Sequence, residues 1–369
     1  MSANPTLDQD EAFARIRLLR SPNIGPVSYA QLLARFGTAA KALNALPDLA
    51  GRSGKPYSAA SEERVTREIA SVRKAGARYL FHDSTDYPAL LASCEGAPPI
   101  LTVRGEVQFA GKPCVAVVGA RNASVAAVKL AREFSLALAE AGFTIVSGLA
   151  RGIDGAAHTG ALAAGQGATV GVIASGIDIA YPPEHAGLQE RIASESLLIA
   201  EQPPGTEPLA RHFPSRNRII AGLATGTLVV EAAPKSGSLI TARLAGESGR
   251  EVMAIPGSPL DSRSHGCNQL IRDGATLVQR PEDVIELLSG FDGLARSTFR
   301  EPAPTWLAAE PLDDDPAELA DLLTLAPVTV DELIRQSGDS AAAVQLALLE
   351  LEIAGRLQRH AGGRVSLSA

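Results

Sequence analysis

Hydrophobic residues change their spacing twice along this chain of 369 residues. Up to about residue 100 they recur at helical spacing, which predicts amphipathic helices. From Cys114 to about Val278 short, continuous apolar runs alternate with helical stretches, and beyond residue 312 helices return with a few short strands. The pattern therefore predicts a helical domain, an α/β domain, a linker and a small third domain, at residues 1–105, 106–290, 291–311 and 312–369.

The apolar runs of the central region predict a parallel sheet. The expected strands lie at 115–118, 144–146, 170–174, 197–200, 228–230 and 252–255. The helices between them are expected at 125–141, 153–164, 239–247 and 267–272, with 219–224 inside one more. Apolar strands joined by crossover helices are typical of a mostly parallel sheet that is buried on both faces. We therefore expect a Rossmann-like, doubly wound α/β fold.

Glycine, serine or charged residues follow every one of these strands. They are Gly119, Ser147, Ser175, Glu201, Glu231 and the turn Pro256-Gly-Ser258. Because parallel strands share one carboxyl edge, where such folds bind ligands, these residues are expected to meet. Two of the loops, Gly119-Ala-Arg121-Asn122-Ala-Ser124 and Ser147-Gly148-Leu-Ala-Arg151-Gly152, open helices with an arginine, an arrangement that favours an anion. Neither loop matches the glycine patterns that hold dinucleotides or triphosphates.

A third basic stretch indicates several phosphates rather than one. It contains Phe213-Pro-Ser-Arg216-Asn217-Arg218 and, after a strand, Lys235-Ser236-Gly237-Ser238. Between Gly205 and Arg243 the basic residues are Arg211, Arg216, Arg218, Lys235 and Arg243, against only Glu207 and Glu231. This local positive charge fits a run of phosphates. Aromatic residues make up only 4% of the chain, so base stacking must depend on few side chains such as Phe213.

Several side chains near this edge could serve an enzyme, and each has a simpler interpretation. Asp154 and His158 are four residues apart on one helix, as an acid–base pair could be, but no third group accompanies them. We interpret Asp154 as a brace of its loop and His158 as packed beneath it. Ser236 and Ser238 are better helix caps than nucleophiles. Glu231 could orient an arginine or act on a sugar.

Charge and composition leave nucleic acid open as a partner. The net charge of −7 argues mildly against it. Residues 310–369, however, contain eleven acidic and four basic residues, so the rest of the chain is neutral overall and can include a basic cleft.

No apolar run is long enough for a membrane span, and the N-terminus lacks a signal-peptide pattern, so we expect a cytoplasmic protein. Cys94, Cys114 and Cys267 are far apart, which predicts neither a disulfide framework nor a metal site, and no cofactor is expected.

These motifs together resemble the signature blocks of the DNA-processing protein A family, DprA, also called Smf. In the family's order they are Ala116–Ser124, Ser147–His158, Phe213–Gly222, Val230–Ala232, Ser236–Ala242, Pro256–Ser258 and Ser264–Ala275. The resemblance implies a non-enzymatic protein of natural transformation that binds incoming single-stranded DNA. It also implies a homodimer, formed through the Rossmann domain, that loads the RecA recombinase onto strands coated with single-strand-binding protein.

The resemblance places the family's DNA cleft on nine residues, namely Arg121, Ser147, Gly148, Arg151, Phe213, Arg216, Asn217, Arg218 and Lys235. The loops described above add Gly119, Asn122, Ser124, Gly152, Arg211, Ser236, Gly237 and Ser238 to the predicted DNA-binding set, with Asp154, His158 and Glu231 as braces. Many members carry a lysine just before the Phe-Pro pair, where this chain has Ala210 and Arg211. No catalytic residue and no metal ligand is predicted.

The two outer domains also fit the resemblance, which implies a helical, sterile-alpha-motif-like N-terminal domain. The turn at Ile24–Gly25 resembles a helix-hairpin-helix, whose amides can hold a DNA phosphate, but it lacks the second glycine and suits a plain helical hairpin better. The order of helices and strands in 312–369 predicts a winged helix with a turn at Ala361-Gly-Gly363. Its acidity favours protein contact or regulation over DNA binding, and a stabilising cap is the simplest alternative.

Two other classes of protein remain as alternatives. A Rossmann-fold nucleotide-processing enzyme, similar to the lysine-decarboxylase-like phosphoribohydrolases, would use a Gly-Gly-x-Gly-Thr-x-x-Glu block. Here Ala224-Thr-Gly-Thr-Leu-Val-Val-Glu231 lacks the first glycines and places the glutamate one residue later, which disfavours that enzyme. A transcriptional regulator would depend on the winged helix alone, and the acidity of that domain makes it the weakest interpretation.

Overall fold

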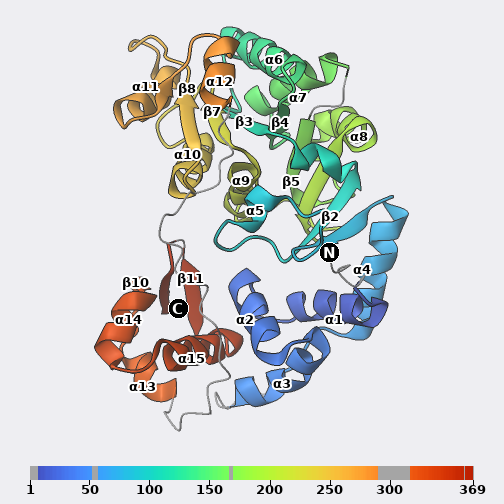
Figure 1. Ribbon diagram of the computed structural model, residues 1–369, viewed down its shortest axis with the longest axis vertical. Helices are drawn as coiled ribbons and strands as arrows, with labels where there is room; N and C mark the ends of the chain where they lie inside the picture. Colours follow the sequence, from blue (N-terminus) through green and yellow to red (C-terminus); the bar gives the residue numbers. More distant parts are fainter. Residues whose placement is uncertain (1–6, 52–56, 166–168, 290–315, 361, 369) are drawn as a thin grey trace. The chain divides into compact units, whose positions relative to one another are not determined.

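The computed structural model describes residues 7–51, 57–165, 169–289, 316–360 and 362–368. Its internal contacts divide the chain into two units, labelled by element in Figure 1. The sheet unit is Glu68–Arg296, and the helical unit combines Met1–Arg67 with Ser297–Ala369. Helix α4 (Glu62–Lys74) contains the boundary between them. The predicted linker and its Trp306 lie outside the described residues.

The sheet unit is built on nine strands in the order β1-β2-β6-β5-β4-β3-β7-β8-β9. The strands are β1 (Arg78–Phe81), β2 (Ile100–Gly105), β3 (Cys114–Val118), β4 (Thr144–Ser147), β5 (Thr169–Gly176), β6 (Leu197–Gln202), β7 (Gly226–Val229), β8 (Glu251–Ala254) and β9 (Thr276–Leu277). From β6 to β9 all neighbours pair in parallel. The predicted mostly parallel, doubly wound sheet is therefore confirmed.

Helices cover both faces of this sheet and bury two separate cores. On one face, α6 (Val125–Glu140), α7 (Ile153–Ala163) and α12 (Pro281–Leu288) pack side chains such as Phe134 and Leu138 against β3 and β7. On the other face, α5 (Ala89–Ala92), α9 (His212–Leu223), α10 (Gly237–Glu247) and α11 (His265–Arg272) pack, with Ile219 and Leu223 at the centre. Helix α8 (Ala186–Glu195) packs beside β5 and β6. This two-faced burial explains why the strands are apolar without interruption.

Strand β1 differs from the sequence-based expectation of a helical region up to about residue 100, whereas a short strand ending at Gly105, the position of β2, is expected from the sequence. Strand β1 pairs antiparallel with β2, and β2 pairs antiparallel with β6. Both strands therefore belong to the central sheet, although their residues precede 106, the predicted start of the α/β domain. The prediction failed at β1 because its four residues, Arg-Tyr-Leu-Phe, are too few to show an alternating pattern.

The helical unit contains two small folds. Its N-terminal part consists of α1 (Gln9–Leu19), α2 (Pro26–Phe36) and α3 (Ala39–Gly51). Its C-terminal part consists of α13 (Pro316–Asp321), β10 (Val328–Thr329), α14 (Val330–Ser337), α15 (Ala341–Ile353), β11 (Leu357–His360) and β12 (Arg364–Leu367). The strands form an antiparallel sheet in the order β10-β12-β11. This arrangement confirms the predicted winged helix.

Within the described ranges, none of the helices combines the length and the apolar character needed to cross a membrane.

Candidate nucleic-acid interface

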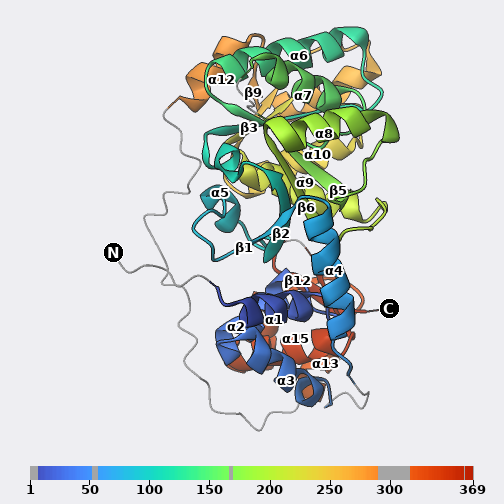
Figure 2. The same ribbon diagram turned by 90° about the vertical axis from the view of Figure 1, so that its right-hand side faces the viewer.

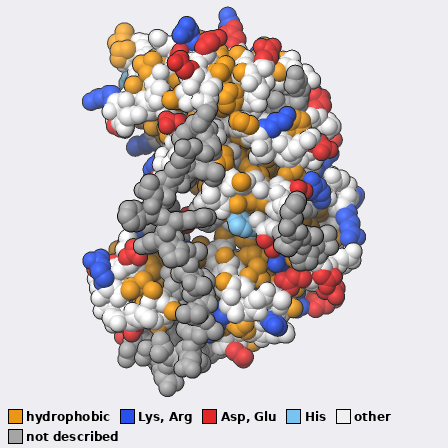
Figure 3. Space-filling model, in the orientation of Figure 1, with side chains coloured by type: hydrophobic (Ala, Val, Ile, Leu, Met, Phe, Trp, Pro, Cys, Tyr) orange, Lys and Arg blue, Asp and Glu red, His pale blue; other side chains and the backbone are white. Residues whose placement is uncertain are grey.

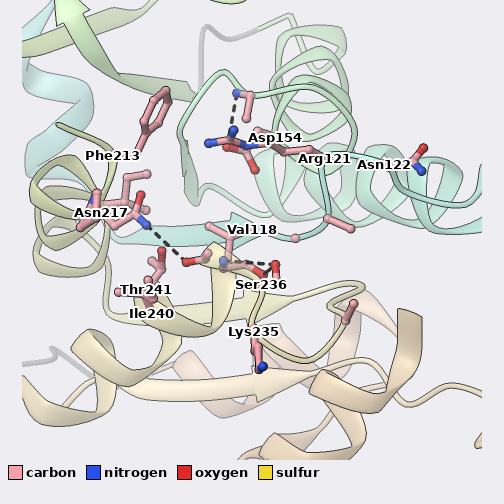
Figure 4. Close-up of a pocket in the computed structure, with 18 of the residues that line it drawn as sticks. Val118, Arg121, Asn122, Asp154, Phe213, Asn217, Lys235, Ser236, Ile240 and Thr241 are labelled. Carbon is pink, nitrogen blue, oxygen red and sulfur yellow. Dashed lines mark hydrogen bonds between the residues drawn. The ribbon is translucent and has the colours of Figure 1, made fainter. Parts of the chain in front are cut away.

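The strand order changes direction between β3 and β7, and a pocket opens at that point. The chain proceeds from β3 through β4 and β5 to β6 on one side, then returns to place β7 on the other side of β3. The loops after β3 and β7 must diverge there, which leaves a crevice at the carboxyl ends of the strands. The pocket has a volume of about 740 Å³ and is lined by the loop after β3, the start of α9 and the start of α10 (Figure 4).

The pocket is cationic. Its lining includes the basic residues Arg121, Arg216, Lys235 and Arg263, and a single acidic residue, Asp154. Arg121 and Lys235 are exposed, whereas Arg216 is 5% exposed and lies at the base. On the face of the molecule shown in Figure 3, basic and acidic side chains are interspersed. The basic character is therefore a property of the pocket rather than of that surface as a whole.

Arg216 is held in place from beneath. Its Nη1 donates a hydrogen bond to the carbonyl of Val172, on β5, at 3.0 Å. A Cβ atom on Gly148 would lie 1.4 Å from the same Nη1, so the backbone of the β4 loop packs directly on the guanidinium. Burial lowers the pKa of Arg216 to about 10, while the nearby Asp154 opposes that change. Arg216 is therefore a fixed cation at neutral pH.

Asp154 organises the loop after β4. Its Oδ2 accepts hydrogen bonds from the backbone N–H of Gly148 at 3.1 Å and of Ala150 at 3.4 Å. Burial raises the pKa of the Asp154 carboxyl, and the field of Arg216 counteracts the shift. The amides of this loop therefore point to a carboxylate of the protein. Asp154 thus links Gly148 and Ala150 of this loop to the start of α7.

Phe213 forms the aromatic wall of the pocket. The guanidinium carbon of Arg121 lies 4.7 Å from the Phe213 ring centroid, and that of Arg216 lies 6.0 Å from it. The centroid of the Tyr181 ring lies 5.8 Å from that of Phe213, with an interplanar angle of 59°. Tyr181 is 42% exposed. The four side chains form a cluster of two cations and two aromatic rings centred on Phe213, an arrangement that suits a stacked base with its phosphate.

The start of α10 forms the opposite wall. Ser236 caps the helix, and its Oγ accepts from the backbone N–H of Ser238 at 3.4 Å. Asn217 donates from Nδ2 to the carbonyl of Gly237 at 3.3 Å and so joins α9 to this wall. In Figure 4, Lys235 points away from Phe213, and Asn122 lies on the far side of Arg121. The predicted residues Gly119, Arg121, Asn122, Phe213, Arg216, Asn217, Lys235, Ser236, Gly237 and Ser238 thus all line one pocket.

Other predicted residues lie at the same sheet edge but outside the lining. Ser147 donates to the carbonyl of Val117 at 2.6 Å, and Ser124 caps α6. Arg218 pairs with Glu201 and donates to the carbonyl of Gly96. The further members of this group are Gly148, Arg151, Gly152 and Arg211. Arg151 forms an exposed ion pair with Glu184, and Arg211 is exposed at the start of α9.

The two remaining braces are buried. Glu231 is 6% exposed and accepts hydrogen bonds from Ser124, at 2.9 Å from the backbone N–H and 2.6 Å from the hydroxyl. His158 is fully buried, with Nδ1 2.7 Å from Thr169 Oγ1. Because Thr169 donates its own proton to the carbonyl of Ile145, the histidine Nδ1–H is the donor in that contact. Neither side chain lines the pocket.

Sequence reasoning missed Arg263 and Tyr181. Arg263 lies in the turn after β8, where it pairs with Asp261 at 2.8 Å. Tyr181 lies in the loop after β5. Both follow strands whose carboxyl ends were expected at the binding edge, and this position in the sequence is the signal that marks them. Among the described residues, no group of three or more His, Cys, Asp or Glu side chains is placed to bind a metal ion.

Known proteins share this architecture and its sequence. Residues 78–289 match the family described as DNA recombination-mediator protein A, residues 9–71 match a DprA-like N-terminal HHH domain, and residues 301–363 match a DprA winged helix domain. Protein Smf of Synechocystis is 35% identical over 78% of this chain and 79% of its own length. Protein Smf of Escherichia coli is 40% identical over 77% of this chain and 76% of its own.

Solved structures agree with these matches. The X-ray structure of DNA processing protein A from Streptococcus pneumoniae covers 74% of this chain and 97% of its own, with a TM-score of 0.64 and 37% identity. DNA processing protein A from Helicobacter pylori, described for its single-stranded DNA binding mode, covers 59% of this chain and 99% of its own, with a TM-score of 0.53 and 27% identity. The chain therefore belongs to the DNA recombination-mediator protein A family.

Proposed function

We propose that this protein binds single-stranded DNA in the pocket between β3 and β7 and acts there as a recombination mediator. The observation that carries the proposal is the cluster of Arg121, Phe213 and Arg216, in which a half-buried ring lies near both an exposed cation and a buried one. A single strand offers both a charged backbone and open bases, and this cluster has a group for each. The Helicobacter pylori relative, described as binding single-stranded DNA, supports the choice of ligand.

The roles of the lining residues follow from their exposure. Arg121, Lys235 and Arg263 are exposed and can approach successive phosphates along the strand. Arg216 is fixed at the base of the pocket, where it supplies positive charge but cannot move with the phosphates of the DNA strand. Phe213, with Tyr181 beside it, provides a surface for a base. Affinity should therefore depend strongly on salt and weakly on sequence.

The remaining predicted residues take supporting roles in this proposal. Ser147, Gly148, Gly152 and Asp154 shape the loop after β4, which packs on the Arg216 guanidinium, and Ser124 with Glu231 fixes the start of α6. Arg218, on α9, pairs with Glu201 of β6 and donates to the carbonyl of Gly96, and so fixes α9 to both. Arg151 and Arg211 are exposed beside the pocket and can extend the path of the strand.

We also propose that the protein has no catalytic activity of its own. The rival function, phosphoribohydrolysis, would require Glu231 to act on a sugar. Both carboxylate oxygens of Glu231 are already engaged by Ser124 at the start of α6, which leaves the side chain as a structural element. Within the pocket lining, Asp154 is the one carboxylate, and it is engaged by backbone amides.

Family membership supports a proposal for the wider cellular role. We propose that the protein acts in the cytoplasm during natural transformation, and that it loads the RecA recombinase onto DNA coated with single-strand-binding protein. We propose a homodimer formed through the sheet unit. Strand β9 supports this, because it ends the sheet as an edge strand and its Leu277 is 47% exposed. An edge strand with an exposed apolar residue is a ready pairing surface.

The decisive experiment compares fluorescence anisotropy of labelled oligo-dT and of a duplex of equal length across a salt series. We expect tighter binding of the single strand and a linear fall of log affinity with log salt. Equal affinity for both DNAs, or an affinity that salt does not change, would reject single-strand binding at a cationic pocket. Size-exclusion chromatography with light scattering tests the dimer separately.

A further inference from the structure

Helix α15 of the winged helix has two apolar faces, and each belongs to a different core. Val344, Leu348 and Leu351 pack in the core of the winged helix itself. Leu349 and Ile353 pack instead in the core of the N-terminal helices. Both are almost completely buried, at 3% and 1% exposed. The helix is therefore shared by the two folds of the helical unit.

Polar contacts reinforce this junction. Asn23, in the turn between α1 and α2, donates from Nδ2 to the carbonyl of Ile353 at 3.0 Å. Gln31 of α2 donates from Nε2 to Oε1 of Gln345 at 2.9 Å. Figure 2 shows α15 next to the first three helices, in agreement with these contacts. The hairpin turn that resembles a DNA-binding motif is thus part of a protein contact.

In winged helices and other helix-turn-helix folds, the second helix of the motif normally enters the DNA groove. Here α14 and α15 form that motif, and α15 is the helix in the recognition position. Its sequence, Ala341–Ile353, contains no Lys or Arg but contains Glu350 and Glu352. Glu352 is paired with Arg359 of β11 at 2.8 Å, so the basic residue nearest to it is also engaged. A helix of this charge is a poor reader of DNA.

Charge also favours the observed pairing. Residues 1–67 contain nine Lys or Arg residues and six Asp or Glu residues, a net charge of +3. Residues 310–369 contain four basic and eleven acidic residues, a net charge of −7. Two folds of opposite charge attract each other before contact, and the apolar faces then hold them together.

We propose that α15 is a docking helix rather than a recognition helix, and that the winged helix is a protein-binding domain whose partner is the N-terminal helical fold of the same protein. Its DNA-reading position is occupied by protein. Single-strand binding is then the task of the sheet unit, and the winged helix and the helical hairpin fold as one body.

A charge test at the Gln31–Gln345 contact examines this proposal in the full-length protein. The variant Gln31→Glu with Gln345→Glu places two carboxylates where one amide hydrogen bond now lies, and should open the junction. The matched control, Gln31→Glu with Gln345→Lys, replaces the bond by an ion pair and should keep it closed. Both side chains are only partly buried, so neither pair removes core packing. Far-ultraviolet circular dichroism checks that both variants fold.

Hydrogen exchange gives the first readout. We expect the double glutamate variant to lose protection in both α2 and α15, by about tenfold in exchange rate, and the Glu/Lys variant to regain it. Affinity for oligo-dT and for duplex DNA should stay within about twofold in both variants.

Unchanged protection in the double glutamate variant, or no recovery in the Glu/Lys variant, would contradict the docking. A loss of DNA affinity that the Glu/Lys variant restores would show that α15 does contact DNA. The hydrogen-exchange readout does not depend on the pocket in the sheet unit, so the two proposals fail separately.

Discussion

The carboxylate of Glu231 accepts hydrogen bonds from both the backbone N–H and the hydroxyl of Ser124, a residue 107 positions earlier in the chain. The contact joins the end of β7 to the start of α6 and so ties together the two loops that flank the pocket. Ser124 in turn caps α6 by accepting from the N–H of Ala127 at 3.1 Å. The one glutamate that could have served a nucleotide-processing enzyme is thus committed to positioning a helix.

Replacing Glu231 should therefore cost stability. We expect Glu231→Ala to lower the free energy of unfolding by about 2–3 kcal/mol, because two buried hydrogen bonds to a charged group are lost. Urea denaturation measures this. The wild-type protein should release no base from nucleoside monophosphates, as followed by chromatography. Base release that disappears in Glu231→Ala would establish the enzyme instead.

Arg121 should contribute affinity without contributing stability. Its exposed guanidinium packs on Phe213, so Arg121→Ala should weaken oligo-dT binding by about tenfold and reduce the salt slope by about 0.7, the value for one phosphate on a single strand. Anisotropy across a salt series gives both numbers. Arg243→Ala is the matched control, because Arg243 is also exposed, pairs with Glu247 on α10 and lies outside the pocket lining. Equal effects of the two substitutions would mean that only net charge matters.

Gly148 should be intolerant of any side chain. An alanine Cβ there would lie 1.4 Å from Arg216 Nη1, which forces the buried guanidinium out of its place. We expect Gly148→Ala to lower the melting temperature and to weaken oligo-dT binding by at least about tenfold, because Arg216 would no longer be fixed beneath Phe213. Gly246→Ala is the control. Gly246 lies in α10, and a Cβ atom there would meet only the Val252 side chain of β8, at 3.8 Å. Alanine at that helical position should stabilise the fold by up to about 1 kcal/mol. If Gly148→Ala binds like the wild type, the tight contact has no role in binding.

Tyr181 should extend the stacking surface beyond Phe213. We expect Tyr181→Ala to weaken oligo-dT binding by about fivefold, within the range for loss of one stacked base, while Tyr181→Phe keeps the wild-type affinity. Oligonucleotides with 2-aminopurine at single positions report stacking directly through quenching of fluorescence. If the Tyr181→Ala protein shows the same quenching pattern as the wild type, no base stacks on Tyr181. That conclusion holds even if Phe213→Ala abolishes binding.

Much of the sheet could be predicted because its strands are buried on both faces and therefore read as unbroken apolar runs. Strand β1 could not, since its four residues are too few to show an alternating pattern. The arginines of α9 show a second limit. Arg216 and Arg218 are two residues apart and identical in chemistry, yet positions i and i+2 lie on nearly opposite faces of a helix. One reaches the base of the pocket, and the other pairs with Glu201. Which face meets the pocket depends on how α9 packs on the sheet, and that is a tertiary property.

Burial of His158 should make the protein sensitive to acid. Burial lowers the pKa of His158 to about 3, from the ordinary value of 6.5 that applies in the unfolded chain. Between these two values the unfolded chain binds a proton that the folded protein does not. The neutral imidazole therefore contributes stability that is complete above pH 6.5 and is lost as the pH falls towards 3. In His158→Gln this contribution is absent. Urea denaturation of both proteins between pH 7 and pH 4 should show a stability slope that is steeper in the wild type by up to about 1.4 kcal/mol per pH unit. Parallel slopes would mean that His158 is not buried in its neutral form.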